Sequence, residues 1–188
     1  DLSIKYGEIL ALLGENGSGK TTLMNILSGI YYPDGGTISV GSKDVTISSP
    51  NDSINLGIGM IHQHFKLVEV FNAVDNFVLG TKEKYQNPKI LKEKILNISN
   101  QFGLEIDPDK KVYNMSVSEK QTVEIMKVLY RGAKILILDE PTAVLTPQET
   151  EKLFKILRKM KEQGSAIIII THKLNEVMEI SDRVAILR

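Results

Sequence analysis

Residues 14–21 read Gly14-Glu15-Asn16-Gly17-Ser18-Gly19-Lys20-Thr21, a complete G-x-x-x-x-G-K-[ST] phosphate-loop pattern. The apolar residues 9–13 before it predict a buried strand, and residues 22–29 after it predict a helix that ends at a glycine. Strand, loop and helix in this order are the context that the pattern requires. We therefore predict a nucleotide-binding site at the junction of this strand and helix.

The residue types of the loop explain how it would hold a nucleotide. Its glycines let the backbone turn tightly, so that N–H groups point at phosphate oxygens, and the start of the helix adds partial positive charge. Lys20 is expected to reach the β- and γ-phosphates, and the Thr21 hydroxyl is a candidate ligand for Mg²⁺. The predicted contacts with the nucleotide come from residues 14–21 and from Thr22.

Bulk composition narrows the class of protein. The chain has 188 residues, with 23 Lys plus Arg against 23 Asp plus Glu, and this neutral balance argues against a nucleic-acid partner. The absence of cysteine excludes disulfides and thiolate metal sites. The longest apolar run, residues 166–170, is too short to cross a bilayer. Because the chain lacks an initiator Met and stops inside a predicted strand, we expect a fragment of a longer polypeptide.

The order of predicted elements indicates an α/β fold. Further strands are predicted at residues 37–41, 57–62, 135–138 and 167–170. Residues 146–149, Thr-Pro-Gln-Glu, predict a capped helix start. Strands that alternate with helices imply a mostly parallel sheet. The segment from about residue 65 to residue 131 has a helical pattern that interrupts this alternation, so we expect a helical subdomain inserted into a single domain of residues 1–188.

Two carboxylates follow the predicted strand at residues 135–138. Asp139 and Glu140 stand at its carboxyl end, where nucleotide sites lie in open parallel sheets. Asp139 is predicted to position Mg²⁺ through its water shell, and Glu140 is predicted to be the general base that activates the attacking water. Such a pair is common as two solvated side chains, but its combination with a phosphate loop favours the functional interpretation.

Two more polar residues follow predicted strands. His172 comes soon after residues 167–170, and its imidazole can hydrogen-bond a γ-phosphate oxygen. Gln63 follows the strand at 57–62, and its amide can bind Mg²⁺ or the attacking water. His62 and His64 flank it without a third suitably spaced ligand, so we interpret both as non-ligands. The predicted catalytic residues are Glu140, His172 and Gln63, and the predicted magnesium ligands are Thr21, Gln63 and Asp139.

The order of these pieces resembles the nucleotide-binding domain of ATP-binding cassette (ABC) transporters, over essentially the whole chain. The resemblance implies a P-loop NTPase fold with a mostly parallel sheet, an inserted helical subdomain and a partial antiparallel β subdomain whose N-terminal strands are missing. It implies ATP and Mg²⁺ as ligands. It also implies a signature segment at residues 115–125, in which Ser116 and backbone N–H groups contact the γ-phosphate of ATP held by a second such domain.

This signature segment departs from the usual L-S-G-G-Q. Ser116 keeps its position, whereas Val117 and Ser118 stand where glycines are usual and Glu119 stands at the glutamine position. Because a glycine permits close backbone approach, Ser118 adds bulk, and Glu119 adds negative charge near a tetra-anionic nucleotide. We therefore expect a weakened signature and slow hydrolysis at the site that it completes.

Residues 62–68, 139–149 and 171–177 resemble the simple-sugar and nucleoside import branch of that family, in which two such domains are fused in one polypeptide. An intact His172 makes the chain similar to the first half. The resemblance implies an ATPase that powers import, peripheral on the cytoplasmic face of the membrane. Its implied partners are a second nucleotide-binding domain, transmembrane permease subunits and, indirectly, an external substrate-binding protein. The alternative is a soluble relative that uses the same ATP switch in DNA repair or translation.

Overall fold

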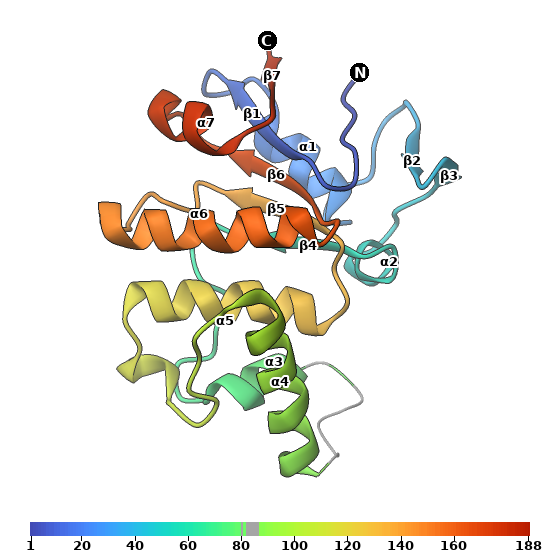
Figure 1. Ribbon diagram of the computed structural model, residues 1–188. Coiled ribbons are helices and arrows are strands. Elements are labelled where there is room, and N and C mark those ends of the chain that lie inside the picture. Colours follow the sequence, from blue (N-terminus) through green and yellow to red (C-terminus); the bar gives the residue numbers. More distant parts are fainter. Residues whose placement is uncertain (80, 82–86) are drawn as a thin grey trace.

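The protein folds around one parallel sheet that is covered by helices on both faces (Figure 1). The computed structural model describes residues 1–79, 81 and 87–188. The strands are β1 (Ile9–Gly14), β2 (Ile38–Val40), β3 (Lys43–Val45), β4 (Ile58–Ile61), β5 (Ile135–Asp139), β6 (Ala166–Ile170) and β7 (Arg183–Leu187). The helices are α1 (Lys20–Leu27), α2 (Pro50–Asn55), α3 (Ala73–Val78), α4 (Pro88–Phe102), α5 (Val117–Tyr130), α6 (Pro147–Glu162) and α7 (Leu174–Ile180), with a short 3-10 helix, η2, at Val112–Asn114. Among the described residues, no helix combines the length and the apolar character that crossing a membrane requires.

The main sheet has five strands in the order β4-β5-β6-β1-β7, and every neighbouring pair is parallel. A separate antiparallel pair is formed by β2 and β3. This arrangement confirms the predicted α/β fold with a mostly parallel sheet and a small antiparallel element. Because β1 lies between β6 and β7, the first strand of the chain is enclosed by the last two, and the carboxyl ends of all five strands point to one edge of the sheet.

Alternate residues of the central strands are buried in two separate clusters. Leu136 and Leu138 of β5 pack in a cluster that also contains side chains of α4, α5 and α6. Ile137, between them, packs in the second cluster together with Met24 of α1. This burial on both faces explains why the strand sequences are continuous apolar runs rather than alternating ones.

A block of helices occupies the chain between β4 and β5, namely α3, α4, η2 and α5. It packs closely on β4 because Gly59 has no side chain: an added Cβ would lie 2.8 Å from Val128 Cβ and 2.9 Å from Ala133 Cβ. Residues 80 and 82–86, which fall inside the predicted subdomain of about 65–131, lie outside the described residues. The boundaries of that subdomain remain a prediction.

Side-chain caps begin several of the helices. At α6, Thr146 Oγ1 accepts a hydrogen bond from Glu149 N at 3.3 Å and Glu149 Oε2 accepts one from Thr146 N at 2.9 Å, which is the predicted capping box. The same arrangement, formed by Ser116 and Glu119, begins α5. The elements β3, α2 and α7 were not predicted, although α2 begins with Ser49 as its N-cap and a proline next to it.

Candidate active site

The phosphate loop joins β1 to α1, and its backbone requires glycine at three positions. Gly14, Gly17 and Gly19 have φ angles of 156°, 86° and 94°, which residues with side chains rarely adopt. Gly14 is also enclosed, since an added Cβ would lie 2.5 Å from Ser18 Oγ and 2.6 Å from the carbonyl oxygen of Leu187. The loop therefore makes the tight turn that its sequence pattern predicts, and α1 begins directly after it.

Lys20 brings a positive charge to this loop. Its Nζ donates hydrogen bonds to the carbonyl oxygens of Gly14, at 2.6 Å, and Glu15, at 2.9 Å. The Ser18 Oγ atom is buried without a hydrogen-bond partner among the described residues. A phosphate oxygen in the loop would give this hydroxyl a partner and would attract the ammonium group. The residues present therefore fit the phosphates of a nucleotide.

Strand pairing brings the other predicted site residues to the edge of the sheet that carries the phosphate loop. Ile61 of β4 pairs with Leu138 of β5. Ile170 of β6 pairs with Asp139 on one side and with Leu12 of β1 on the other. Because the strands are parallel, the residues that follow them emerge at the same edge. The predicted residues at this edge are Gln63, Asp139, Glu140 and His172.

Glu140 and His172 are in direct contact. His172 Nδ1 lies 2.9 Å from Glu140 Oε1, and the Glu140 side chain is 17% exposed whereas that of His172 is 77% exposed. Glu140 has a φ angle of 47°, a left-handed conformation that is uncommon outside glycine and is often found at functional sites. Its second carboxylate oxygen, Oε2, is buried without a hydrogen-bond partner among the described residues. One oxygen of this carboxylate is thus positioned by the imidazole, and the other can accept a proton.

The electrostatics of Asp139 favour a bound cation. Burial raises the pKa of Asp139 and the neighbouring Glu140 carboxylate raises it further, while His62 and Lys20 act in the opposite direction. A divalent cation would offset this repulsion. Within the described residues, no three His, Asp or Glu side chains cluster as a metal site. A magnesium site here would therefore combine the Asp139 carboxylate with the Thr21 hydroxyl and the Gln63 amide, which are oxygen donors of the kind that Mg²⁺ prefers.

A polar network that was not predicted joins the segments after Glu140 and His172. Thr142 is fully buried, with 0% exposure, and its Oγ1 donates a hydrogen bond to Glu176 Oε2 at 2.5 Å. Lys173 Nζ donates to the Thr142 carbonyl oxygen at 3.0 Å and pairs with Glu176 at 3.0 Å. Lys173 and Glu176 are three residues apart, a spacing from which the sequence could have predicted an ion pair on a helix. No sequence pattern indicated the role of Thr142.

Two charged side chains of α5 hold the loop that follows Gln63. Glu124 Oε1 accepts a hydrogen bond from Lys66 N at 2.6 Å, and Lys127 Nζ donates one to the Lys66 carbonyl oxygen at 2.8 Å. Glu124 is buried, and burial lowers the pKa of Lys127. Lys66, Glu124 and Lys127 line a cavity of about 230 Å³, and His62 lines it too. Burial lowers the pKa of the His62 imidazole, which favours its neutral form.

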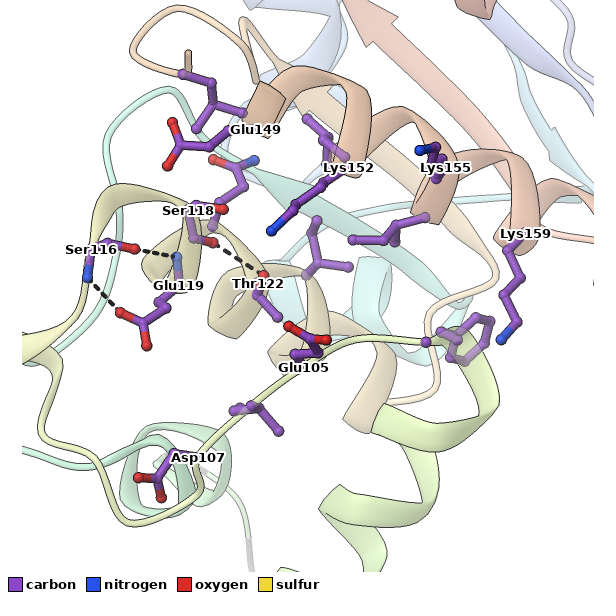
Figure 2. A pocket seen from close by; sticks show the side chains of 18 residues that line it. Glu105, Asp107, Ser116, Ser118, Glu119, Thr122, Glu149, Lys152, Lys155 and Lys159 are labelled. Atoms are coloured by element: carbon purple, nitrogen blue, oxygen red, sulfur yellow. Dashed lines mark hydrogen bonds between the residues drawn. The ribbon is translucent and has the colours of Figure 1, made fainter. Parts of the chain in front are cut away.

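Ser116 is separate from this edge of the sheet. Figure 1 shows α5 on the other side of α6 from β1 and α1, and Ser116 is the N-cap residue of α5. Its Oγ accepts a hydrogen bond from Glu119 N at 3.2 Å, so its hydroxyl hydrogen can still be donated to a ligand. Ser116 lines a cleft of about 770 Å³ between α5 and α6 (Figure 2). The structure therefore brings the phosphate loop, Glu140 and His172 together, but not Ser116.

The structure adds an ion pair to Glu119, which was predicted to add negative charge near the nucleotide. Its carboxylate accepts hydrogen bonds from Ser116 N at 2.7 Å and from Lys110 Nζ at 2.6 and 2.9 Å. The bonds from Lys110, followed by the one from Ser116, hold the pKa of Glu119 below its ordinary value. Ser118 has a normal helical backbone, so this position does not require glycine for conformational reasons.

The chain is similar to ATP-binding proteins of transport systems. A family model described as ABC transporter matches residues 1–143. The nucleoside import ATP-binding protein NupA of Lactococcus lactis subsp. cremoris and the guanosine import ATP-binding protein NupO of Bacillus subtilis are each 50% identical over 191 residues, covering 100% of this chain and 38% of the relative. The solved structure of cbiO1 from Clostridium perfringens, part of the ABC transporter complex cbiONQ, matches with a TM-score of 0.85 and 31% identity, covering 100% of this chain and 76% of that one. The chain thus spans well under half the length of NupA and NupO.

Proposed function

Because this chain belongs to the ABC transporter family, we propose that it is the ATP-binding and ATP-hydrolysing part of an importer. Similarity to NupA and NupO supports a nucleoside as the transported substrate, and the branch that residues 139–149 resemble makes a simple sugar the second candidate. One observation carries the proposal. Glu140 and His172 form their 2.9 Å contact at the edge of the sheet that also holds the phosphate loop.

In this proposal residues 14–22 hold the phosphates of ATP. Backbone N–H groups of the loop and the start of α1 supply partial positive charge, and Lys20 exchanges its bonds to loop carbonyls for bonds to phosphate oxygens. Mg²⁺, when bound, would neutralise phosphate charge, and Thr21, Gln63 and Asp139 are the residues that would hold it. The raised pKa of Asp139 supports this role, since a cation would relieve the cause of the shift.

Hydrolysis is assigned to Glu140 as general base. The contact with His172 fixes Oε1, and Oε2 remains to accept the proton of the attacking water. His172 orients Glu140 by donating from Nδ1, and it could donate to a phosphate oxygen from Nε2 as well when both ring nitrogens carry hydrogen. The Gln63 amide would orient the water. The bonds among Thr142, Lys173 and Glu176 support this geometry, because they tie together the segments that carry the base and the imidazole.

The proposed partners lie outside this chain. Ser116 would complete the ATP site of a second nucleotide-binding domain. The greater length of NupA and NupO supports the fusion of that domain in the same polypeptide. Permease subunits would span the membrane, an external binding protein would deliver the substrate, and this domain would lie on the cytoplasmic face. The relatives named for import favour this arrangement over a soluble switch in DNA repair or translation.

A transport assay tests the proposal. The full-length protein and the permease encoded with it would be reconstituted in vesicles, and uptake of labelled guanosine and ribose would be measured with and without Mg-ATP. We expect ATP-dependent uptake of the nucleoside, and none in the matched Glu140→Gln variant. ATP hydrolysis by a protein that never associates with a permease would contradict the importer and favour the soluble switch.

A further inference from the structure

Lys110 and Glu119 form an ion pair beside the N-cap of α5. Lys110 belongs to the segment between α4 and η2, and its Nζ lies 2.6 Å from Oε1 and 2.9 Å from Oε2 of Glu119. The two side chains are 33% and 41% exposed, so the pair lies at the protein surface. Figure 2 shows Glu119 next to Ser116, joined by the two hydrogen bonds of the capping box.

We propose that Lys110 is a positioning residue for the ATP site that this helix start completes, and that it acts by cancelling the charge of Glu119. The inference rests on the proposed function, in which Ser116 contacts ATP held by a second domain. Lys110 lies outside the phosphate loop, the sheet edge and the signature segment.

The start of α5 has two uses that conflict: Glu119 caps the helix there, and phosphates of ATP are proposed to bind there. The N-terminal end of α5 attracts anions through its N–H groups, and Glu119 already satisfies one of them by accepting from Ser116 N. A free carboxylate one helical turn from Ser116 would repel the phosphates that Ser116 is proposed to contact. Lys110 binds both carboxylate oxygens, so the capping box is kept without a net negative charge.

The neighbouring lysines do not perform this role. Lys120, directly after Glu119, pairs with Glu69 at 3.3 Å. Lys111, directly after Lys110, joins Asn72 in an isolated backbone bridge. The cation that lowers the pKa of Glu119 is Lys110. Lys111 is therefore a matched control, since it is a lysine in the same segment without the contact to Glu119.

The alternative role for Lys110 is purely structural, as an anchor of its segment on α5. The two roles predict different effects of a second substitution. If Lys110 cancels charge, removing the charge of Glu119 should repair the loss of Lys110. If Lys110 only anchors the segment, Glu119→Gln cannot repair that loss, because the ion pair is already broken.

The test uses the full-length protein with Lys20→Ala, so that the loop of the second domain is the tighter site for Mg-ATP. Calorimetry measures the remaining affinity. Adding Lys110→Met should weaken it about tenfold at low salt, and the deficit should shrink at high salt because the repulsion is screened. Lys110→Arg and Lys111→Met should leave the affinity unchanged. Lys110→Met with Glu119→Gln should return to within about threefold of the Lys20→Ala parent, with Glu119→Gln alone as the reference.

Two results would overturn the inference. One is unchanged affinity in Lys110→Met, and the other is a deficit that Glu119→Gln fails to reverse in a protein whose thermal melting shows it to be folded. Failure of the proposed function looks different: the Lys20→Ala parent itself would bind no Mg-ATP, before any change at Lys110, and that result would remove the basis of both.

Discussion

The carboxylates at the sheet edge near Glu140 and the carboxylate at the helix start near Ser116 have opposite electrostatic surroundings. At the sheet edge two adjacent carboxylates are half-buried, the pKa of Asp139 is raised, and Glu140 Oε2 has no partner among the described residues. At the helix start, Glu119 has both oxygens bound by Lys110 and its pKa is lowered. The carboxylates are left without a cation at the sheet edge, where Mg²⁺ is proposed to bind, whereas the carboxylate at the helix start is paired with Lys110, where phosphates of the partner's ATP are proposed to lie.

Replacing Glu140 should produce the largest difference between the two regions. Glu140→Gln should slow ATP hydrolysis by about 10²–10⁴-fold, because it removes the proposed general base while keeping shape and hydrogen-bonding capacity. ATP binding should persist, and the ATP-bound pair of domains should accumulate. Steady-state turnover and size-exclusion chromatography of the full-length protein measure the two effects. Near-normal turnover would place the base elsewhere.

Replacing Lys20 should affect binding rather than chemistry. Lys20→Ala removes a charged donor from the phosphate loop, which costs about 1.5–3 kcal/mol, or about 10- to 150-fold in the dissociation constant of this site. Calorimetry with Mg-ATP on the full-length protein, which contains the second site as an internal reference, would resolve the two affinities. Two unchanged binding steps would reject the assignment of the loop.

Neutralising one carboxylate in each region should change stability in opposite directions. The folded pKa of Asp139 is raised, so its ionisation destabilises the fold as the pH rises through that pKa, and Asp139→Asn should raise the melting temperature at neutral pH. The folded pKa of Glu119 is lowered, so its pair with Lys110 stabilises the fold above the unfolded pKa and is lost as the pH falls through the folded one.

Glu119→Gln should accordingly lower the melting temperature at neutral pH. Each shift should be at most about 2–4 °C, and the one at Glu119 should be smaller because exposed pairs contribute little. Melting without nucleotide from neutral pH down to about pH 2 would measure both. The difference at Asp139 should vanish below its unfolded pKa of about 3.9, and the difference at Glu119 should vanish below its lowered folded pKa. Shifts of the same sign would show that the two regions do not differ in this way.

The smallest effect is expected from Ser118→Gly. Ser118 has a helical backbone, and its carbonyl oxygen accepts a hydrogen bond from Thr122 that the substitution retains. We expect total ATPase to change by less than about twofold, because this region completes the partner's site and the Glu140 site does most of the hydrolysis. A many-fold rise would instead indicate two equal sites that are both limited by the signature.

Much of the sheet edge could be predicted because its parts are local. The strands are buried on both faces, so they are continuous apolar runs, and parallel pairing brings whatever follows them to one edge. That reasoning alone placed Gln63, Asp139, Glu140 and His172 together before any contact was known. The capping box of α6 was predictable for the same reason, since both of its partners lie within one turn.

Contacts between distant segments could not be predicted in this way. The bond from Thr142 to Glu176 spans 34 positions and the one from Lys66 to Glu124 spans 58, so each depends on how helices pack rather than on a local pattern. The ion pair of Glu119 was missed for a related reason. Its spacing from Ser116 is a capping-box signal, but its cation, Lys110, comes from a segment that only the tertiary fold brings near.

The two hydrogen bonds between α5 and the backbone of Lys66 have a mechanical consequence. Both backbone groups of Lys66 are bound by side chains of α5, and Gln63 is only three residues away. A helix bends little over its length, so any displacement of α5 must carry this loop with it unless both bonds break. We therefore expect Ser116, at the first turn of α5, and Lys66, bound to the middle of that helix by Glu124 and Lys127, to move together. We expect a displacement at either point to reach the other through the helix itself, without rearrangement of the side chains between them.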